Sequence, residues 1–329
     1  PAYTYRTAEI LRPHLKRVWG QEWVDQVMGC HMANPSEMFR AMADGDPYPI
    51  KAFFTLGNNS LMSYPNQHQI LRAMLNQDLI VAHEIFMTPT AMLADYVMPG
   101  DVFSERNHIA DSWAWTSNLT LSEAVADAPE QSSSTFRFWT DLAHAMGFGD
   151  RFPWDSLEEV IDYRLEPSGM TFEEFRAAKY LDVQPPKYRK YRKTGFATPS
   201  GKVELASSIL GDLGFDPLPY HRPAPATSDE FPYRVFSGVR EDPFFQTGQR
   251  NIGVLRRRVP APHFFVHPED AAKEGLVDGE WAKLKTAHGE VRMKVSIQDS
   301  MRQGHIRVPH GWWYPETRGE VDLAGAFVS

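Results

Sequence analysis

The stretch with the most restrictive pattern lies near the C-terminus. Apolar residues occupy every second position from 291 to 297, in the order VRMKVSI. A repeat of two residues is that of a β-strand with one face toward a core and the other toward solvent. Residues 281–286 predict a partner strand, and His288-Gly289 predicts the tight turn between the two. This part of the chain therefore has to form a sheet.

The flanking residues extend this prediction. Pro268 fits a first helical position, acidic residues follow it, and Gly275 comes after the last turn, which predicts a short helix. Ile306 and Val308 resume the alternation further along the chain. Residues 263–313 therefore predict a small β-barrel that ends in a polar and aromatic loop.

Two phrases in this stretch, VHPEDAAKEGLVDGEWAKLKTAHGEVRMKV and GHIRVPHGWW, resemble the C-terminal barrel of the molybdopterin oxidoreductases. This is the dimethyl-sulfoxide-reductase superfamily, which includes formate dehydrogenases, nitrate reductases and thiosulfate or polysulfide reductases. The resemblance implies that residues 232–329 are a six-stranded double-psi-type β-barrel, truncated at its C-terminus, that binds a molybdopterin dinucleotide.

The first half of the chain has a different order of elements. Short apolar runs at 50–56, 79–82 and 94–98 predict three strands, and the segments between them predict helices, the first beginning at Pro65. A β-α-β-α-β order favours a parallel sheet, in which ligands bind where the strands end in loops. We therefore expect an α/β domain at residues 1–195, partial in this chain, with the loops after its three strands at one edge.

The loops at this edge are suited to a nucleotide. Gly57 lets the backbone approach a ligand closely, and Asn58, Asn59 and Ser60 offer hydrogen-bond donors to phosphate or ribose oxygens. Glu84 is an acceptor suited to the paired N–H groups of a guanine. From the residues alone, ordinary turn residues are the stronger interpretation, because LGNNS is neither a Walker A loop nor a GxGxxG fingerprint.

The resemblance shifts that balance toward a nucleotide. LGNNSLMSYP and VAHEIFMTPTAMLADYVMPG are similar to the superfamily's GxNP loop and its acidic TxTAxxAD segment. Asn59-Ser60 stands where Asn-Pro is usual, and His83-Glu84 where Gln-Asp is common. The resemblance implies that the α/β domain binds the guanosine end of the cofactor through Gly57, Asn58, Asn59, Glu84 and Thr88.

The loop SGVREDPFFQTGQR, which follows the first barrel strand, is rich in donors. Guanidinium groups suit anions and pterin carbonyls. In the superfamily the matching loop closes over the pterins, and we expect the HGW segment to meet it from the other side. We interpret the arginines at 256–258 as a solvated run. The pterin-binding residues implied here are Ser237, Gly238, Arg240, Gln246, Arg250, His310, Gly311 and Trp312.

Several other features have a structural and a functional interpretation. The pair Cys30-His31 suggests a nucleophile or ligand, but a lone cysteine is more often a small buried residue. Trp113 and Trp115 suit either a substrate funnel or packing, and packing is favoured. The basic run at 187–193 has the pattern of a phosphate-binding patch, yet in an acidic chain it favours a linker docked on an acidic neighbour.

Two further helices are expected in the middle of the chain. Residues 136–146 predict a helix with Phe138, Leu142 and Met146 inward. Residues 151–180 predict helical and acidic structure with a solvated face.

Composition sets the remaining limits. The 329 residues suit two domains, with a Gly- and Pro-rich linker at 196–231. The net charge of −8 and the pI near 5.9 argue against nucleic acid as a partner. No run of 18 apolar residues and no signal peptide is present, so no membrane span is expected. Cys30 is the only cysteine, which rules out a four-cysteine iron–sulfur cluster held by this sequence alone.

These limits and the resemblance together predict a part of a catalytic subunit. The chain begins at Pro1 and lacks a counterpart of the superfamily's N-terminal cysteine-rich segment and of its metal ligand, so we expect the C-terminal half of a larger subunit. Its partners would be the N-terminal half, which would hold a 4Fe-4S cluster if one exists, and an iron–sulfur electron-transfer subunit. A cytoplasmic location is slightly favoured over a periplasmic one.

The function implied is that of a molybdenum or tungsten bis(molybdopterin guanine dinucleotide) oxidoreductase. The α/β domain would bind the guanine dinucleotide and the barrel would cap the pterins, for two-electron redox or oxygen-atom transfer at the metal. The alternative is a non-catalytic cofactor-binding or assembly subunit of a split complex. A nicotinamide dehydrogenase is disfavoured, because no glycine fingerprint opens the first helix.

Overall fold

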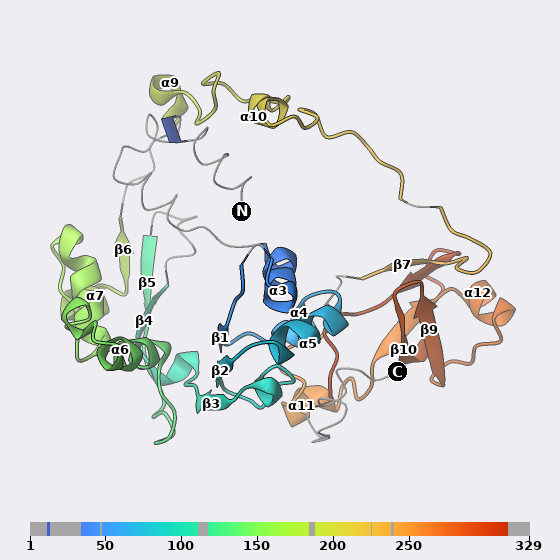
Figure 1. Cartoon of the computed structure of the whole chain (residues 1–329), viewed down its shortest axis with the longest axis horizontal. Coiled ribbons are helices and arrows are strands. Elements are labelled where there is room, and N and C mark those ends of the chain that lie inside the picture. The colour runs from blue at the N-terminus through green and yellow to red at the C-terminus, as the bar shows by residue number, and fades with distance from the viewer. Residues whose placement is uncertain are drawn as a thin grey trace. The chain divides into compact units, whose positions relative to one another are not determined.

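The structure is a computed structural model, and it describes residues 12–13, 34–46, 48–110, 118–183, 188–224, 226–237 and 240–314 (Figure 1). The Cys30-His31 pair and the Trp113 and Trp115 side chains lie outside these residues. The described residues fall into two compact units. One lies within Pro1–Glu37, Ile109–Leu121 and Glu158–Ala224, and the other within Met38–His108, Ser122–Leu157 and Pro225–Ser329.

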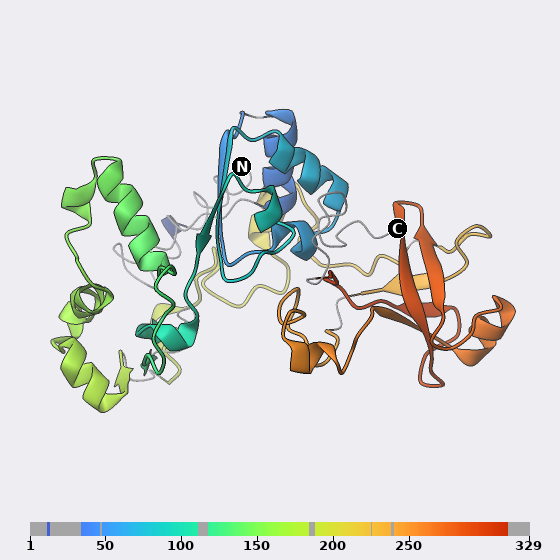
Figure 2. The same cartoon turned by 90° about the horizontal axis from the view of Figure 1, so that it is seen from below.

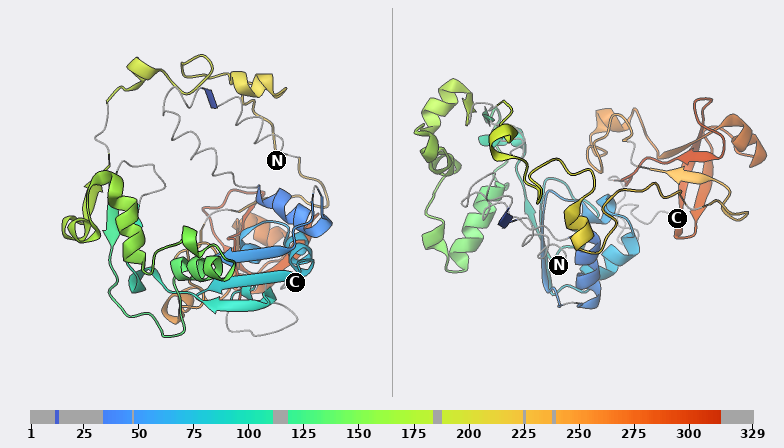
Figure 3. Two further views of the ribbon diagram at one scale, coloured as in Figure 1. Left: turned by 60° about the vertical axis from the view of Figure 1, so that its left-hand side comes forward. Right: turned by 90° about the horizontal axis from the view of Figure 1, so that it is seen from above.

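The second unit contains the predicted parallel sheet. Strands β1 (Ala52–Leu56), β2 (Leu79–Glu84) and β3 (Tyr96–Pro99) lie side by side in that order, and each pair is parallel (Figure 3). Each strand is short and largely apolar, as a sheet packed against helices requires. The helices of this region are α3 (Pro35–Asp44), α4 (Ser60–Ser63), α5 (Gln67–Leu75) and the 3-10 turns η1 (Ala91–Leu93) and η2 (Phe103–Glu105).

Several boundaries in this region differ from the prediction, among them the start of β1 at Ala52 instead of residue 50. Strand β2 continues through His83 and Glu84, because their backbones remain in register with β1 and β3. Strand β3 begins two residues after Ala94, since the preceding residues form a turn. Helix α5 begins after Pro65 at a cap formed by Asn66, whose side chain accepts a hydrogen bond from the Gln69 backbone.

The core of this region includes one side chain from the distant C-terminal tail. Phe39, Ile70, Met74 and Ile80 are buried in one cluster with Trp313, which is 2% exposed. Burial of an aromatic ring is among the largest single contributions to a core. The tail after the last barrel strand is therefore part of the α/β core.

Helix α6 (Thr135–Ala145) confirms the predicted helix at 136–146, with Phe138 and Leu142 half-buried as expected and Met146 not. Met146 was expected inward and is 63% exposed, because it caps the helix end rather than lying on its core side. The buried residues are Thr140 and Ala143. Phe138 packs against the His83 ring with 5.4 Å between centroids, so α6 covers the end of β2.

The first unit contains a three-stranded sheet and several short helices. Strands β4 (His108–Ala110), β5 (Asn118–Ser122) and β6 (Tyr180–Asp182) form a sheet in that order. The predicted helical segment at 151–180 is confirmed as two helices joined by turns, the second capped by Thr171 and Glu174. The remaining elements of this unit are α7 (Leu157–Leu165), η5 (Glu166–Ser168), α8 (Phe172–Ala178), α9 (Tyr191–Thr194) and α10 (Ser208–Asp212), whereas the 3-10 turn η4 (Gly149–Arg151) belongs to the second unit.

The C-terminal region forms a curled mixed sheet (Figure 2). Its strand order is β7-β11-β8-β10-β9, with a core of alternate residues such as Phe264, Val266, Met293, Val295 and Ile306. The turn between the two longest strands lies at 287–288, one position before the predicted one. The elements are β7 (Arg234–Phe236), α11 (Gly253–Arg256), β8 (His263–Val266), α12 (Pro268–Lys273), β9 (Trp281–Thr286), β10 (Gly289–Ile297) and β11 (His305–Arg307).

The described part of this sheet has five strands and forms a half-barrel, so the six-stranded barrel expected from the sequence stays a prediction. The short helix at Pro268 and the hairpin are confirmed. Among the described helices, none is long and apolar enough to cross a membrane.

Candidate cofactor-binding site

The carboxyl ends of the three parallel strands meet at one edge of the sheet. Leu56 pairs with His83, and Glu84 pairs with Pro99, so the loops after the strands are neighbours, as predicted. Gly57 has a positive φ of 59°, and its N–H donates to the His83 carbonyl over 3.0 Å. Its conformation suits glycine, and a ligand can approach the backbone there.

Asn59 is held rigidly in this edge. Its side chain is 7% exposed, and its Oδ1 accepts a hydrogen bond from the Thr90 hydroxyl over 2.9 Å. Its Nδ2 is buried and has no hydrogen-bond partner among the described residues. A buried amide with one open donor is costly unless a ligand satisfies it. Asn58 is exposed, and its Oδ1 accepts from the Ser60 hydroxyl.

Glu84 and Thr88 have different environments at the end of β2. Burial raises the pKa of Glu84 to about 7, and three exposed apolar residues at 85–87 follow it. Thr88 is buried, and its hydroxyl accepts a hydrogen bond from the Ala91 backbone over 3.2 Å. Glu84 is thus the better placed of the two for a ligand, because the Thr88 hydroxyl is engaged in starting a turn.

The C-terminal region brings most of its predicted site residues together around Arg250. This side chain is 1% exposed and lies between aromatic rings, with its guanidinium carbon 4.8 Å from the Phe244 ring centre and 5.1 Å from that of Trp312. It donates to the Gln246 carbonyl over 2.5 Å and to the His310 carbonyl over 3.2 Å. Burial lowers the pKa of Arg250 to about 10, which leaves it cationic near neutral pH.

The tail completes this cluster from the opposite side. His310 Nε2 and Gln246 Oε1 are 2.6 Å apart, which joins the two segments by a second hydrogen bond. Gly311 has a φ of 74°, and a Cβ there would lie 2.8 Å from a Thr247 methyl group, so no other residue fits easily. Trp313 donates from its indole to the Thr247 carbonyl over 2.7 Å. The expected meeting of the two segments is therefore present.

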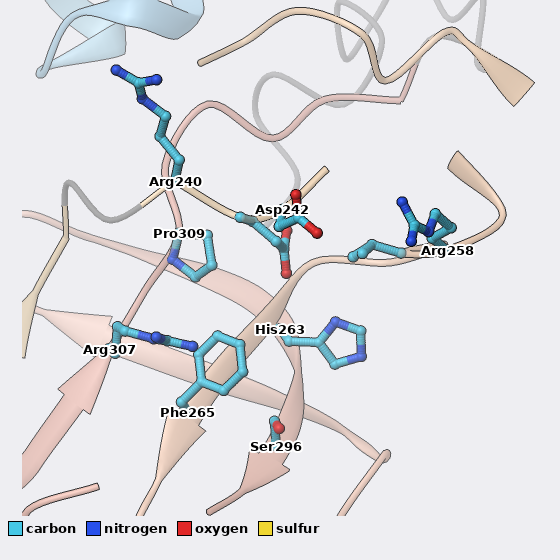
Figure 4. Close-up of a pocket in the computed structure, with 10 residues that line it drawn as sticks. Arg240, Asp242, Arg258, His263, Phe265, Ser296, Arg307 and Pro309 are labelled. Atoms are coloured by element: carbon cyan, nitrogen blue, oxygen red, sulfur yellow. The ribbon is translucent and has the colours of Figure 1, made fainter. Parts of the chain in front are cut away.

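The remaining predicted residues of this loop lie outside the cluster. Ser237 is exposed, and Gly238 falls outside the described residues. Arg240 is exposed, with its guanidinium 4.4 Å from the Phe245 ring centre. It lines a neighbouring cavity of about 450 Å³ together with residues of β8 and β11 (Figure 4).

Three charged residues beside this cluster were missed by the sequence analysis. Arg256 was interpreted as solvated, but its guanidinium lies 4.6 Å from the Trp312 ring centre, whereas Arg257 and Arg258 are exposed as expected. Arg307 lies over Phe265 at 3.8 Å. Glu241 is half-buried and interacts electrostatically with these two arginines and with Arg250. A carboxylate within an arginine-rich loop is the signal that could have identified it.

Within the part of the chain that the structure describes, no group of three or more His, Cys, Asp or Glu side chains could hold a metal ion. The donors that are present suit a different kind of ligand. Both the sheet edge and the Arg250 cluster contain buried hydrogen-bonding groups that have no partner among the described residues. At the Arg250 cluster several of these groups belong to arginines. This set fits an anionic group rich in acceptors, as a pterin dinucleotide is. The donor atoms are Asn59 Nδ2, Arg250 Nε, Arg307 Nε and Trp312 Nε1.

Comparison with known families agrees with this reading. Residues 26–122 match the molybdopterin oxidoreductase family, and residues 235–325 match the molybdopterin dinucleotide binding domain. The chain therefore belongs to the molybdopterin oxidoreductases, the dimethyl-sulfoxide-reductase superfamily.

Among individual proteins, the chain is 40% identical over its whole length to acetylene hydratase of Syntrophotalea acetylenica, of which it covers 46%. It is 27% identical over 90% of its length to the probable oxidoreductase YoaE of Bacillus subtilis, covering 43% of that protein. The solved structure of acetylene hydratase from Pelobacter acetylenicus matches all of this chain and 46% of that one, with 39% identity and a TM-score of 0.92. The chain thus spans about half the length of these relatives.

Proposed function

We propose that this chain holds a molybdenum or tungsten bis(molybdopterin guanine dinucleotide) cofactor as part of a catalytic subunit. The observation that carries the proposal is the joining of Gln246 and Arg250 to His310 and Trp312, within the segment that matches the dinucleotide-binding family. Such a cofactor supplies two-electron redox or oxygen-atom transfer at its metal. The chain's own residues bind and orient it.

In this proposal the sheet edge and the half-barrel bind different parts of the cofactor. We assign the guanosine end to the sheet edge, where Gly57 offers backbone, Asn59 offers a buried donor and Glu84 offers an acceptor. We assign the pterins to the half-barrel, where Arg250 presents a cation that cannot move, because two rings and two carbonyls fix it. A sixth strand that closes the barrel is part of this proposal.

The partners follow from the same proposal. Because the chain spans 46% of the acetylene hydratase that it resembles, we propose that the remaining half of a subunit supplies the metal ligand and any iron–sulfur cluster. An iron–sulfur electron-transfer subunit would be needed only for a redox reaction.

A second candidate reaction is hydration of a carbon–carbon triple bond. It is favoured by the 40% identity to acetylene hydratase, against 27% to the probable oxidoreductase. Hydration consumes no electrons, so the two candidates differ in their need for a reductant or oxidant.

The test is metal and pterin analysis of the protein purified from its native host without oxygen. Molybdenum or tungsten by mass spectrometry, and the fluorescence of oxidised pterin released by acid, should both be present in amounts near that of the protein. Conversion of acetylene to acetaldehyde without added reductant would assign the hydratase reaction. Absence of both metal and pterin would contradict the proposal.

A further inference from the structure

Glu241 occupies an unusual position beside the Arg250 cluster. It is half-buried, and its Oε2 is buried without a hydrogen-bond partner among the described residues. Three guanidinium groups act on it electrostatically, those of Arg250, Arg307 and Arg256. They come from the loop after β7, from β11 and from α11, so the fold itself gathers three cations around one carboxyl group.

Glu241 also lines a cavity that a ligand could fill. The cavity has a volume of about 450 Å³, and three arginines line it, of which Arg307 also acts on Glu241 electrostatically (Figure 4). Arg307 extends along the ring of Phe265, which fixes its direction. The lining residues with polar side chains are Arg240, Glu241, Asp242, Arg258, His263, Ser296 and Arg307.

The charges of Glu241 and of the arginines determine how strongly the cavity binds an anion. Several guanidinium groups gathered in a partly buried place repel one another, and a carboxylate among them reduces that repulsion. A doubly charged anion in the cavity would offset the same repulsion and would itself be repelled by an ionised Glu241. The anionic ligand and the Glu241 carboxylate therefore compete for the same positive charge of the arginines.

We propose that Glu241 is the internal counter-ion of this arginine cluster and limits its affinity for the diphosphate of a dinucleotide, which binds when the carboxyl group is neutral. The inference rests on the proposed function and adds a means of control to it. A proton from solvent is taken up by the carboxylate as the diphosphate binds.

The protonation equilibrium of the site is compatible with such control. Burial raises the pKa of Glu241 to about 7, against the opposing effect of the arginines. A carboxyl group with this pKa changes charge close to neutral pH. The titratable and charged groups that line the cavity with Glu241 or act on it electrostatically are Arg240, Asp242, Arg250, Arg256, Arg258, His263 and Arg307.

The probe is P1,P2-dimethyl pyrophosphate, a diester whose own charge is constant near neutral pH. Its affinity for the full chain would be measured by titration calorimetry at about pH 6 and about pH 8. We expect wild-type affinity to fall by roughly tenfold between the two, because the carboxylate forms. Glu241→Gln should bind at about pH 8 nearly as tightly as the wild type does at about pH 6.

Asp242→Asn is the matched control, because it removes one negative charge from the same loop at an exposed position. It should keep the pH dependence of the wild type. Any other titrating group contributes equally in wild type and Glu241→Gln, so the difference between those two proteins isolates Glu241. If Glu241→Gln does not fold, the number of protons taken up by the wild type on binding, measured in buffers of different ionisation enthalpy, provides the same test.

The inference is overturned if the wild type does not bind the probe, if Glu241→Gln keeps the full pH dependence, or if binding takes up no proton. A protein that contains metal and pterin but gives one of these results loses only the role of Glu241. A protein without metal and pterin loses the proposed function, whatever the probe shows.

Discussion

Arg250 donates a hydrogen bond to the carbonyl of His310, 60 residues further along the chain. The bond joins the loop after β7 to the tail after β11. Because Arg250 is also enclosed by Phe244 and Trp312, the two segments form one unit with a fixed cation at its centre.

Arg250→Lys should destabilise this unit. Lysine retains the charge but cannot donate to both the Gln246 and His310 carbonyls in a fixed geometry, nor stack as a plane between two rings. We expect a loss of about 2 to 4 kcal/mol in the free energy of unfolding, measured with urea. The exposed Arg257→Lys should change it by less than about 0.5 kcal/mol, and equal effects of the two would contradict the central role of Arg250.

Trp313→Ala should be more severe than replacement of any exposed tryptophan. Trp313 is 2% exposed in the core with Phe39 and Ile70, and its indole donates to Thr247. The expected loss is about 3 to 5 kcal/mol. Trp281, at 44% exposed, is the matched control, and Trp281→Ala should cost about 1 kcal/mol.

Glu84 should make stability depend on pH. Its pKa is raised from an ordinary value of 4.5 to about 7, so the folded protein binds the proton more tightly than the unfolded chain. The stabilisation this provides is complete below about pH 4.5 and is lost as the pH rises through about 7.

Glu84→Gln should therefore be more stable than the wild type at about pH 8, by about 1 to 2 kcal/mol once partial exposure is taken into account, and similar to it at about pH 5. Thermal unfolding at the two pH values would measure this. The control Glu130→Gln removes a charge from an exposed position and should show no such difference. If the stability difference between Glu84→Gln and the wild type were the same at both pH values, burial would not control the pKa of Glu84.

Asn59→Ala should affect the sheet edge more than Asn58→Ala does. Asn59 accepts from the Thr90 hydroxyl in a buried place, and alanine would leave that hydroxyl without its acceptor. We expect a loss of about 1 to 3 kcal/mol. Asn58 is exposed, so the same substitution there should cost less than about 1 kcal/mol, as urea titration would show.

The sequence predicted those features that depend on local pattern. The alternation at 291–297 predicted strand β10, and the apolar runs predicted three parallel strands. The site was less predictable, because it depends on contacts between distant segments. Arg256 and Arg257 are adjacent and chemically identical, and only the fold places one of them against Trp312. Glu241 lies in an arginine-rich loop of the sequence, but only the fold brings Arg250, Arg256 and Arg307 to act on it together.

The measurement that tests the central claim most directly is the nucleotide content of the cofactor. Acid hydrolysis of the protein purified from its native host should release guanosine monophosphate together with oxidised pterin, two of each for every molybdenum or tungsten atom. That ratio is expected if the sheet edge and the half-barrel hold a bis(molybdopterin guanine dinucleotide). Pterin and metal without guanine nucleotide, or guanine nucleotide without pterin, would contradict the account.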